Sequence, residues 1–193
     1  MARKILALAA GLLLTATVPA AAWTPSAQAI AAADQGKVWH SVVADGKTGA
    51  QLGRAVVNID APPAVVWKLM TDCAAVRRIM PSNRGCRVIE RKGSSETVEH
   101  LVKTPLMPKL RTVFRQDFEP QKRILITRVD GDLKVISGEW RLEALPGGGS
   151  RVSQEMRMQT AFPAPGPMVR SFLSNELSVG LANLRREAEA AAK

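Results

Sequence analysis

Most of the C-terminal half of the chain repeats one pattern, in which short β-rich runs alternate with turn sequences. Stretches such as Lys92-Gly93-Ser94 and Asp130-Gly131 separate the runs and supply the residues that hairpin turns require. Strands joined by tight turns pair antiparallel, so the pattern predicts one long meander. Its expected strands span 87–91, 96–103, 110–119, 123–129, 135–145 and 151–160. Two earlier β-rich runs, 37–43 and 51–59, flank a further turn sequence.

Helical patterns interrupt and then end this series of strands. Asp60-Ala61-Pro62-Pro63 is typical of a helix start, because Pro is tolerated in the first helical turn. Apolar residues then recur at helical spacing up to Asp72, and 74–79 predicts a second short helix. After a Pro-rich segment, a long amphipathic helix follows, with one face formed by Val169, Phe172, Leu173, Leu177, Leu181, Leu184 and Ala188.

This order of elements predicts an α+β fold in residues 37–192, with a curved antiparallel sheet wrapped around the long C-terminal helix. The last helix is the only predicted element long enough to cover the concave face of so long a meander. A sheet that grips a single helix often leaves a cavity between the two.

The N-terminus has the pattern of a secretory signal. Arg3 and Lys4 precede an apolar run over 5–14, and small residues then offer cleavage after Ala22 or after Ala29. We therefore expect a signal peptide over 1–22, with the later site as the alternative, and a flexible leader over 23–36. An uncleaved anchor is the other reading, but it needs about 20 apolar residues, and polar residues interrupt this run.

The chain is strongly basic, with 27 Lys plus Arg against 17 Asp plus Glu and a formal net charge of +10. In an exported protein, the anions within reach are phospholipid head groups rather than nucleic acid. We therefore expect transient contact with an anionic membrane surface, and no nucleic-acid partner. The alternative is a solvated basic surface that keeps the protein in solution.

Cys73 and Cys86 both lie in the part expected to be exported, where an even cysteine count favours a disulfide. Closing so short a loop would stabilise the fold by about 3 kcal/mol. Two buried free thiols are the alternative. A metal site would need ligands that this region lacks.

Several segments carry a family resemblance: Ala61–Trp67 with Leu69, Thr71 and Asp72, then Met80-Pro81, Arg87–Arg91, Gly138–Leu142, and the final helix with Leu173, Leu177, Leu181, Asn183 and Leu184. Together they resemble the START-like SRPBCC superfamily, and more narrowly its polyketide cyclase/dehydrase and coenzyme Q-binding START-domain group. The resemblance covers about residues 50–190. It implies a helix-grip fold with a deep hydrophobic tunnel under the C-terminal helix, which holds a lipid, quinone, sterol or polyketide.

Strand alternation nominates residues that face this tunnel, because every second side chain points to the same face of a sheet. His100 alternates with Val98 and Val102, so it is a candidate to hydrogen-bond a ligand carbonyl or hydroxyl; an ordinary core position is the alternative. The full set predicted to bind ligand is Met70, Val98, His100, Phe114, Trp140, Met156, Met158, Leu173 and Leu177.

A strand connection with an apolar tip and basic flanks is the candidate for the cavity mouth. A tip of this kind suits insertion at an anionic membrane surface, whereas a loop folded back over the cavity is the alternative. The residues predicted at this mouth or membrane loop are Lys103, Leu106, Met107, Lys109, Arg111 and, from a second loop, Phe162.

Common hydrolase, nucleotide, redox and zincin signatures are missing from the sequence, and we expect neither a cofactor nor a metal. The leading hypothesis is a carrier or sensor for a hydrophobic small molecule, such as a lipid or isoprenoid quinone. The alternative is a cyclase/dehydrase-type enzyme in which His100 and a nearby Glu move protons. A third reading is a basic envelope-interaction module with a collapsed core. The sequence does not determine the oligomeric state.

Overall fold

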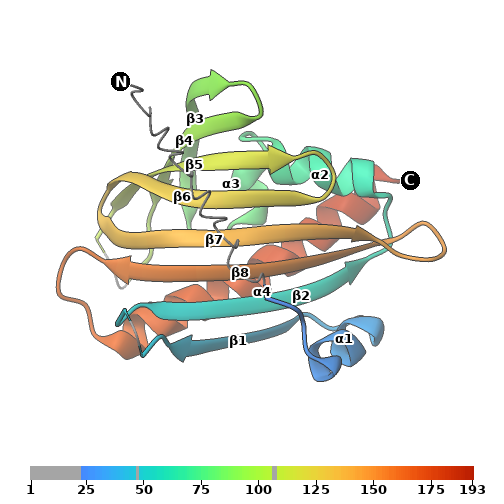
Figure 1. Ribbon diagram of the computed structural model, residues 1–193, viewed down its shortest axis with the longest axis horizontal. Helices are drawn as coiled ribbons and strands as arrows, with labels where there is room; N and C mark the ends of the chain where they lie inside the picture. The colour runs from blue at the N-terminus through green and yellow to red at the C-terminus, as the bar shows by residue number, and fades with distance from the viewer. Residues whose placement is uncertain (1–22, 47, 106–107) are drawn as a thin grey trace, which may run out of the picture.

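The computed structural model describes residues 23–46, 48–105 and 108–193, so the predicted signal segment over 1–22 lies outside the described residues. An eight-stranded antiparallel sheet forms the body of the molecule, in the order β1-β2-β8-β7-β6-β5-β4-β3 (Figure 1). The strands are β1 (Trp39–Ala44), β2 (Gln51–Ile59), β3 (Asn83–Lys92), β4 (Ser95–Val102), β5 (Leu110–Glu119), β6 (Arg123–Gly131), β7 (Leu133–Ala144) and β8 (Ser150–Thr160).

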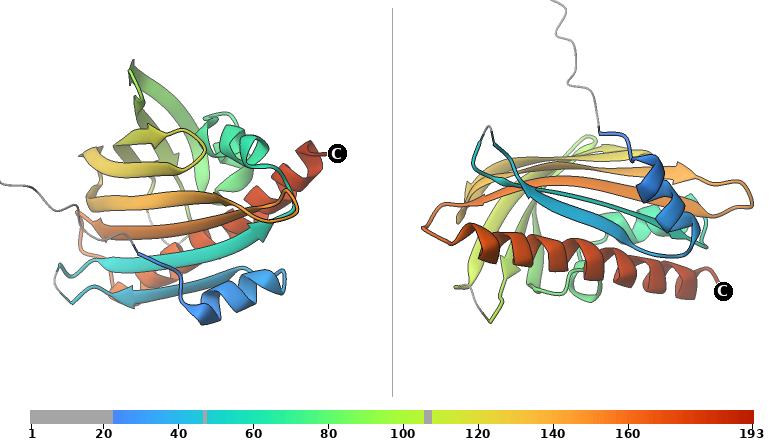
Figure 2. Two further views of the ribbon diagram at one scale, coloured as in Figure 1. Left: turned by 45° about the vertical axis from the view of Figure 1, so that its right-hand side comes forward. Right: turned by 90° about the horizontal axis from the view of Figure 1, so that it is seen from below.

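Three helices lie against the inner face of this sheet or beside it. The short helices α2 (Pro63–Thr71) and α3 (Val76–Ile79) carry the chain from β2 to β3 at the far edge of the sheet. The long helix α4 (Gly166–Ala191) runs along the concave face, as Figure 2 shows, and packs against β2, α2 and α3. The predicted α+β helix-grip architecture is thus confirmed.

The closest approach of α4 to the sheet is at β2. A Cβ atom on Gly53 would lie 2.5 Å from Leu177 Cδ1 and 2.9 Å from Leu173 Cδ2, so only glycine allows this packing distance. Alternate residues of β2, including Ala55 and Val57, are fully buried in the same core. The sequence of β2 therefore sets how closely the helix lies on the sheet.

The leader expected to be flexible over 23–36 instead contains a helix, α1 (Ala27–Asp34). The Ser26 side chain accepts a hydrogen bond from the Ala29 backbone N–H at 3.2 Å, which caps the helix. Ala29 and Ala33 are buried against Val56 on the face of β2 that points away from α4. The expectation was wrong because a short Ala-rich segment has no strong amphipathic pattern, whereas the packing surface on the sheet stabilises it.

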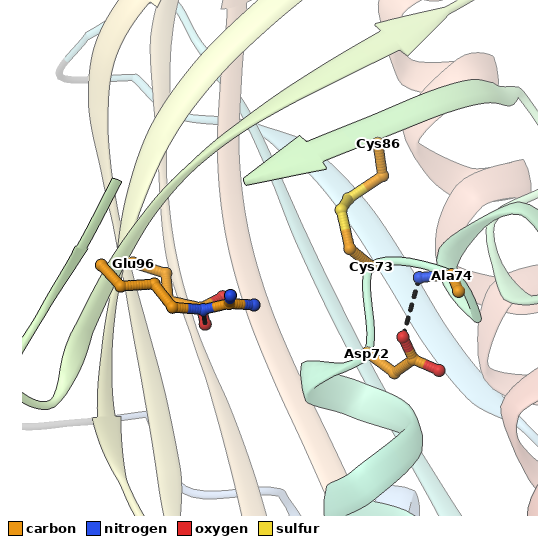
Figure 3. The surroundings of a disulfide bond; sticks show 6 residues. Asp72, Cys73, Ala74, Cys86 and Glu96 are labelled. Atoms are coloured by element: carbon orange, nitrogen blue, oxygen red, sulfur yellow. Dashed lines mark hydrogen bonds and ion pairs between the residues drawn. A yellow bond between two sulfur atoms is a disulfide. The ribbon is translucent and has the colours of Figure 1, made fainter. Parts of the chain in front are cut away.

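The predicted disulfide is present and joins the loop after α2 to β3 (Figure 3). Cys73 and Cys86 have their Cα atoms 5.5 Å apart, within the usual range for a disulfide. Beside it, the Asp72 carboxylate accepts a hydrogen bond from the Ala74 backbone N–H at 2.8 Å. This bridge holds β3 and the α2–α3 segment together on one side of α4.

No helix among the described residues is both long and apolar enough to span a membrane.

Candidate functional site

A cavity of about 150 Å³ lies between the concave face of the sheet and the helices. Its walls come from α2, α3, α4 and every strand from β3 to β8, and most of the side chains that line it are apolar. A space with this lining favours an apolar ligand, because the ligand surface buried there leaves water.

Eight of the nine residues predicted to bind ligand lie on the wall of this one cavity. Val98 does not: it is buried in a core cluster with Phe114, Ile124 and Ile126, which themselves line the cavity. Strand alternation identifies the face of the sheet on which a residue lies, but not its distance from the cavity. The eight that line the cavity are Met70, His100, Phe114, Trp140, Met156, Met158, Leu173 and Leu177.

His100 lies in β4 with its ring edge-on to Phe114, at 4.8 Å between ring centroids. Burial lowers the pKa of His100 to about 4, because a charged imidazolium would lose its hydration there. The ring is therefore neutral at pH 7. In that state it can donate one hydrogen bond and accept another, but it is a poor general acid.

A group of three polar residues, which we call the polar corner, also lines the cavity: Ser82, Asn83 and Glu176. The Ser82 backbone N–H donates to Glu176 Oε1 at 3.2 Å. Burial raises the pKa of Glu176 to about 7, against the lowering effects of Ser82 and of Arg84. The sequence analysis missed this group, although the helical spacing of Glu176 from Leu173 and Gly180 places it on the buried face of α4.

The predicted mouth residues divide into different environments. The β4–β5 connection borders the cavity, since Val102 and Leu110 at its two ends line the wall. Lys103 and Lys109 are exposed on this connection, whereas Leu106 and Met107 lie outside the described residues. Of the second loop, Phe162 is half-buried and packs against the main core.

Arg111 lies near the start of β5, beside the β4–β5 connection, with its side chain on the outer face of the sheet. It alternates with Leu110 and Thr112, which line the cavity, so its side chain points the other way. There it pairs with Glu99 at 2.5 Å and with Asp130 at 2.8 Å. These contacts hold the pKa of both carboxyl groups below their usual values.

Within the described residues, no group of three or more His, Cys, Asp or Glu side chains is arranged to hold a metal ion.

Comparison with known proteins agrees with this geometry. The family model described as "Polyketide cyclase / dehydrase and lipid transport" matches residues 59–185, which contain every element that lines the cavity. A search of curated protein sequences finds no match to the chain.

Solved structures share the fold at low sequence identity. Human StAR-related lipid transfer protein 5 aligns with a TM-score of 0.68 and 13% identity, over 81% of this chain and 84% of that one. A STAR-related lipid transfer protein from Xanthomonas axonopodis aligns with a TM-score of 0.66 and 16% identity, over 78% of this chain and 93% of that one. The Zhui aromatase/cyclase from Streptomyces sp. R1128 aligns with a TM-score of 0.59 and 16% identity, over 80% of this chain and 93% of that one.

Proposed function

Because the chain belongs to the polyketide cyclase/dehydrase and lipid transport family, we propose that it is an exported carrier or sensor that binds a lipid or isoprenoid quinone without turning it over. The observation that carries the proposal is the apolar cavity under α4, closed on one side by the sheet and on the other by the helices. Burial of apolar ligand surface there contributes about 25 cal/mol per Å² to the binding free energy, and this contribution needs no catalytic group.

The size of the cavity limits how much of a ligand it holds in this conformation. About 150 Å³ is the size of an engineered cavity that accepts benzene, so it accommodates a ring or a short part of a chain. A complete lipid or quinone must therefore extend through the mouth or displace side chains. The two Met residues of β8 suit such a change, because an unbranched thioether repacks readily.

A cavity under the last helix also argues against the envelope-module reading. That reading required bulky side chains to fill this space, and the wall residues leave it open.

One observation favours an enzyme as the second candidate. Glu176 has a pKa near 7 inside the cavity, which is the range in which a side chain can both take up and release a proton. A cyclase/dehydrase-type role would use Glu176, with neutral His100 as a hydrogen-bonding partner of the substrate. Loss of turnover with retained binding in a Glu176→Gln variant would support this candidate.

Native mass spectrometry, with organic extraction, tests the main proposal on protein purified from the envelope of its own host. We expect a stoichiometric hydrophobic molecule to co-purify. Ligand-free protein that also takes up nothing from a total lipid extract of that host would contradict binding.

Export is part of the proposal and is supported by the disulfide, while the position of α1 indicates where the signal would be cleaved. Cleavage after Ala29 would remove the Ser26 cap and the stacking of Trp23 on Trp39, whereas cleavage after Ala22 leaves both intact. N-terminal sequencing of the exported protein should therefore start at Trp23. A sequence that starts at Met1 or Ile30 would contradict this assignment.

We also propose a transient contact between the β4–β5 connection and anionic membranes. Lys103 and Lys109 are exposed there, and each cation near such a surface contributes about 1 kcal/mol. Replacing both with Ala should weaken binding to phosphatidylserine-containing vesicles at least ten-fold. The matched control replaces Lys92 and Lys122, which are exposed on turns at the other end of the sheet; an equal loss there would contradict the assignment.

A further inference from the structure

The polar corner differs from Thr112 and Gln154, the other buried polar residues of the cavity wall, because two of its side chains have buried atoms without a hydrogen-bond partner. Ser82, Asn83 and Glu176 are 6%, 3% and 8% exposed. Ser82 directly precedes β3, Asn83 is the first residue of that strand, and Glu176 lies in α4. The corner adjoins the start of the β4–β5 connection, since Lys103 N–H donates to the Ser82 carbonyl at 3.0 Å.

The side chain of Asn83 has no hydrogen-bond partner at either end. Neither its Oδ1 nor its Nδ2 is bonded to any part of the chain that the structure describes, whereas Ser82 Oγ has only a contact with the Glu176 carboxyl, outside normal hydrogen-bond geometry. A buried polar group left unsatisfied costs about 1–3 kcal/mol, and native proteins rarely keep one without a reason. Both side chains line the cavity, so a molecule in the cavity can reach them.

The groups of the corner match an uncharged polar head. The Asn83 amide supplies donors and an acceptor, and the Ser82 hydroxyl supplies one donor with acceptor capacity. Protonated Glu176 adds a donor. The charged and titratable groups that face Glu176 are few: Arg84 acts on it from β3, and His100, across the same cavity, is neutral.

We propose that Ser82, Asn83 and Glu176 bind the hydroxyl or carbonyl head of an otherwise apolar ligand, whose remainder lies along Met156, Leu173 and Leu177. This inference rests on the proposed function and narrows its ligand class. A plain hydrocarbon would leave the Asn83 amide unsatisfied. A charged head would lose its hydration in the cavity without a paired opposite charge.

Two probes of nearly equal shape test the proposal: 1-naphthol and 1-methylnaphthalene, titrated by fluorescence at pH 6. In an apolar cavity the methyl compound binds more tightly, because the hydroxyl must lose its water. In the wild-type protein we expect naphthol to bind at least as tightly as methylnaphthalene. If the wild-type protein binds methylnaphthalene ten-fold or more tightly than naphthol, this result alone would overturn the proposal.

The Asn83→Leu variant replaces the amide by an apolar group of similar size. It should weaken the binding of naphthol at least ten-fold and change the binding of methylnaphthalene less than two-fold. Asn175→Leu is the matched control, since Asn175 is exposed on α4 next to Glu176. Ser82→Ala should also weaken the binding of naphthol, and it is the second test variant if Asn83→Leu does not fold.

The outcomes separate this proposal from the proposed function. If methylnaphthalene binds and neither corner variant weakens naphthol selectively, the corner is not the head-group site, although the cavity still binds apolar ligands. If neither probe binds the wild-type protein, apolar binding in this cavity fails and the corner assignment fails with it.

Discussion

Glu176 and His100 face the same cavity but depart from their ordinary pKa values in opposite senses. Burial raises the pKa of Glu176 from 4.5 to about 7 and lowers that of His100 from 6.5 to about 4, so both groups remain neutral where they would ionise in water. Between pH 4.5 and 7 the folded state holds a proton on Glu176 that the unfolded chain releases. Between pH 4 and 6.5 the unfolded chain holds a proton on His100 that the folded state excludes.

These two effects have opposite signs in the free energy of unfolding. The Glu176 contribution falls as pH rises through 4.5 to 7, and the His100 contribution rises from pH 4 to 6.5, each by about 3 kcal/mol. As the pH rises from 4.5 to 7, the free energy of unfolding of Glu176→Gln should therefore increase by about 3 kcal/mol relative to that of wild type. For His100→Gln, the same difference should increase by a similar amount as the pH falls from 6.5 to 4. Urea denaturation at several pH values measures both differences, and differences that do not vary with pH would show that neither shift exists.

Gly53 sets the distance between β2 and α4, so even one added methyl group should lower the stability of the fold. Gly53→Ala places a Cβ atom 2.5 Å from Leu177 Cδ1, and we expect a loss of about 1–3 kcal/mol of stability through overpacking. Gly46→Ala is the matched control, because its Cβ would meet no heavy atom within 4 Å. Thermal unfolding of both variants checks the prediction, and equal melting temperatures would contradict it.

At the scale of elements, the disulfide joins the α2–α3 segment to the edge strand β3. Its removal should open a closed loop in the unfolded chain, raise the conformational entropy of that chain and so cost about 3 kcal/mol of stability. The double variant Cys73→Ser, Cys86→Ser should therefore unfold at lower urea concentration than the oxidised wild type. Wild type treated with a reductant provides the control and should match the variant. Equal midpoints for all three would mean that the bridge does not stabilise the fold.

The elements that carry strong patterns were predictable from sequence, and those that depend on tertiary contacts were not. The strand spans 51–59 and 110–119 were predicted to the residue, since turn sequences bound them. Strand β3 begins at Asn83, earlier than the predicted 87, because pairing of Asn83 with Val102 extends it. Helix α1 was missed because its stability comes from burial on the outer face of β2.

The cavity wall was partly predictable for the same reason. Alternation along a strand identifies its inner face, and Phe114, Trp140 and Met156 lie on the cavity wall. It does not show how far a residue lies from the cavity, so it did not separate Val98, which packs in an adjoining core cluster. Glu176 was overlooked because a charged residue on a helix is normally assigned to the solvent side, and only the packed structure shows that it closes the cavity.

At the scale of the whole molecule, the hydrogen-bonded sheet forms one wall of the cavity and the helices form the other. Backbone hydrogen bonds join each strand to its neighbours, so we expect enlargement for a longer ligand to come from α4, the mouth loops or the side chains. Ligand binding and stability of the ligand-free protein then compete for the same volume. Wall residues that pack more closely in the ligand-free protein leave less volume for an apolar ligand.

This competition predicts the effect of filling the cavity from the sheet side. Met156→Trp places a larger side chain in the space beneath α4, so we expect binding of 1-methylnaphthalene to fall at least ten-fold while the melting temperature stays equal or rises. Leu125→Trp is the matched control, since Leu125 is 39% exposed on β6, outside the cavity wall. Fluorescence titration and thermal unfolding of both variants measure the two effects. If Met156→Trp binds the probe as tightly as Leu125→Trp does, the ligand does not occupy this cavity.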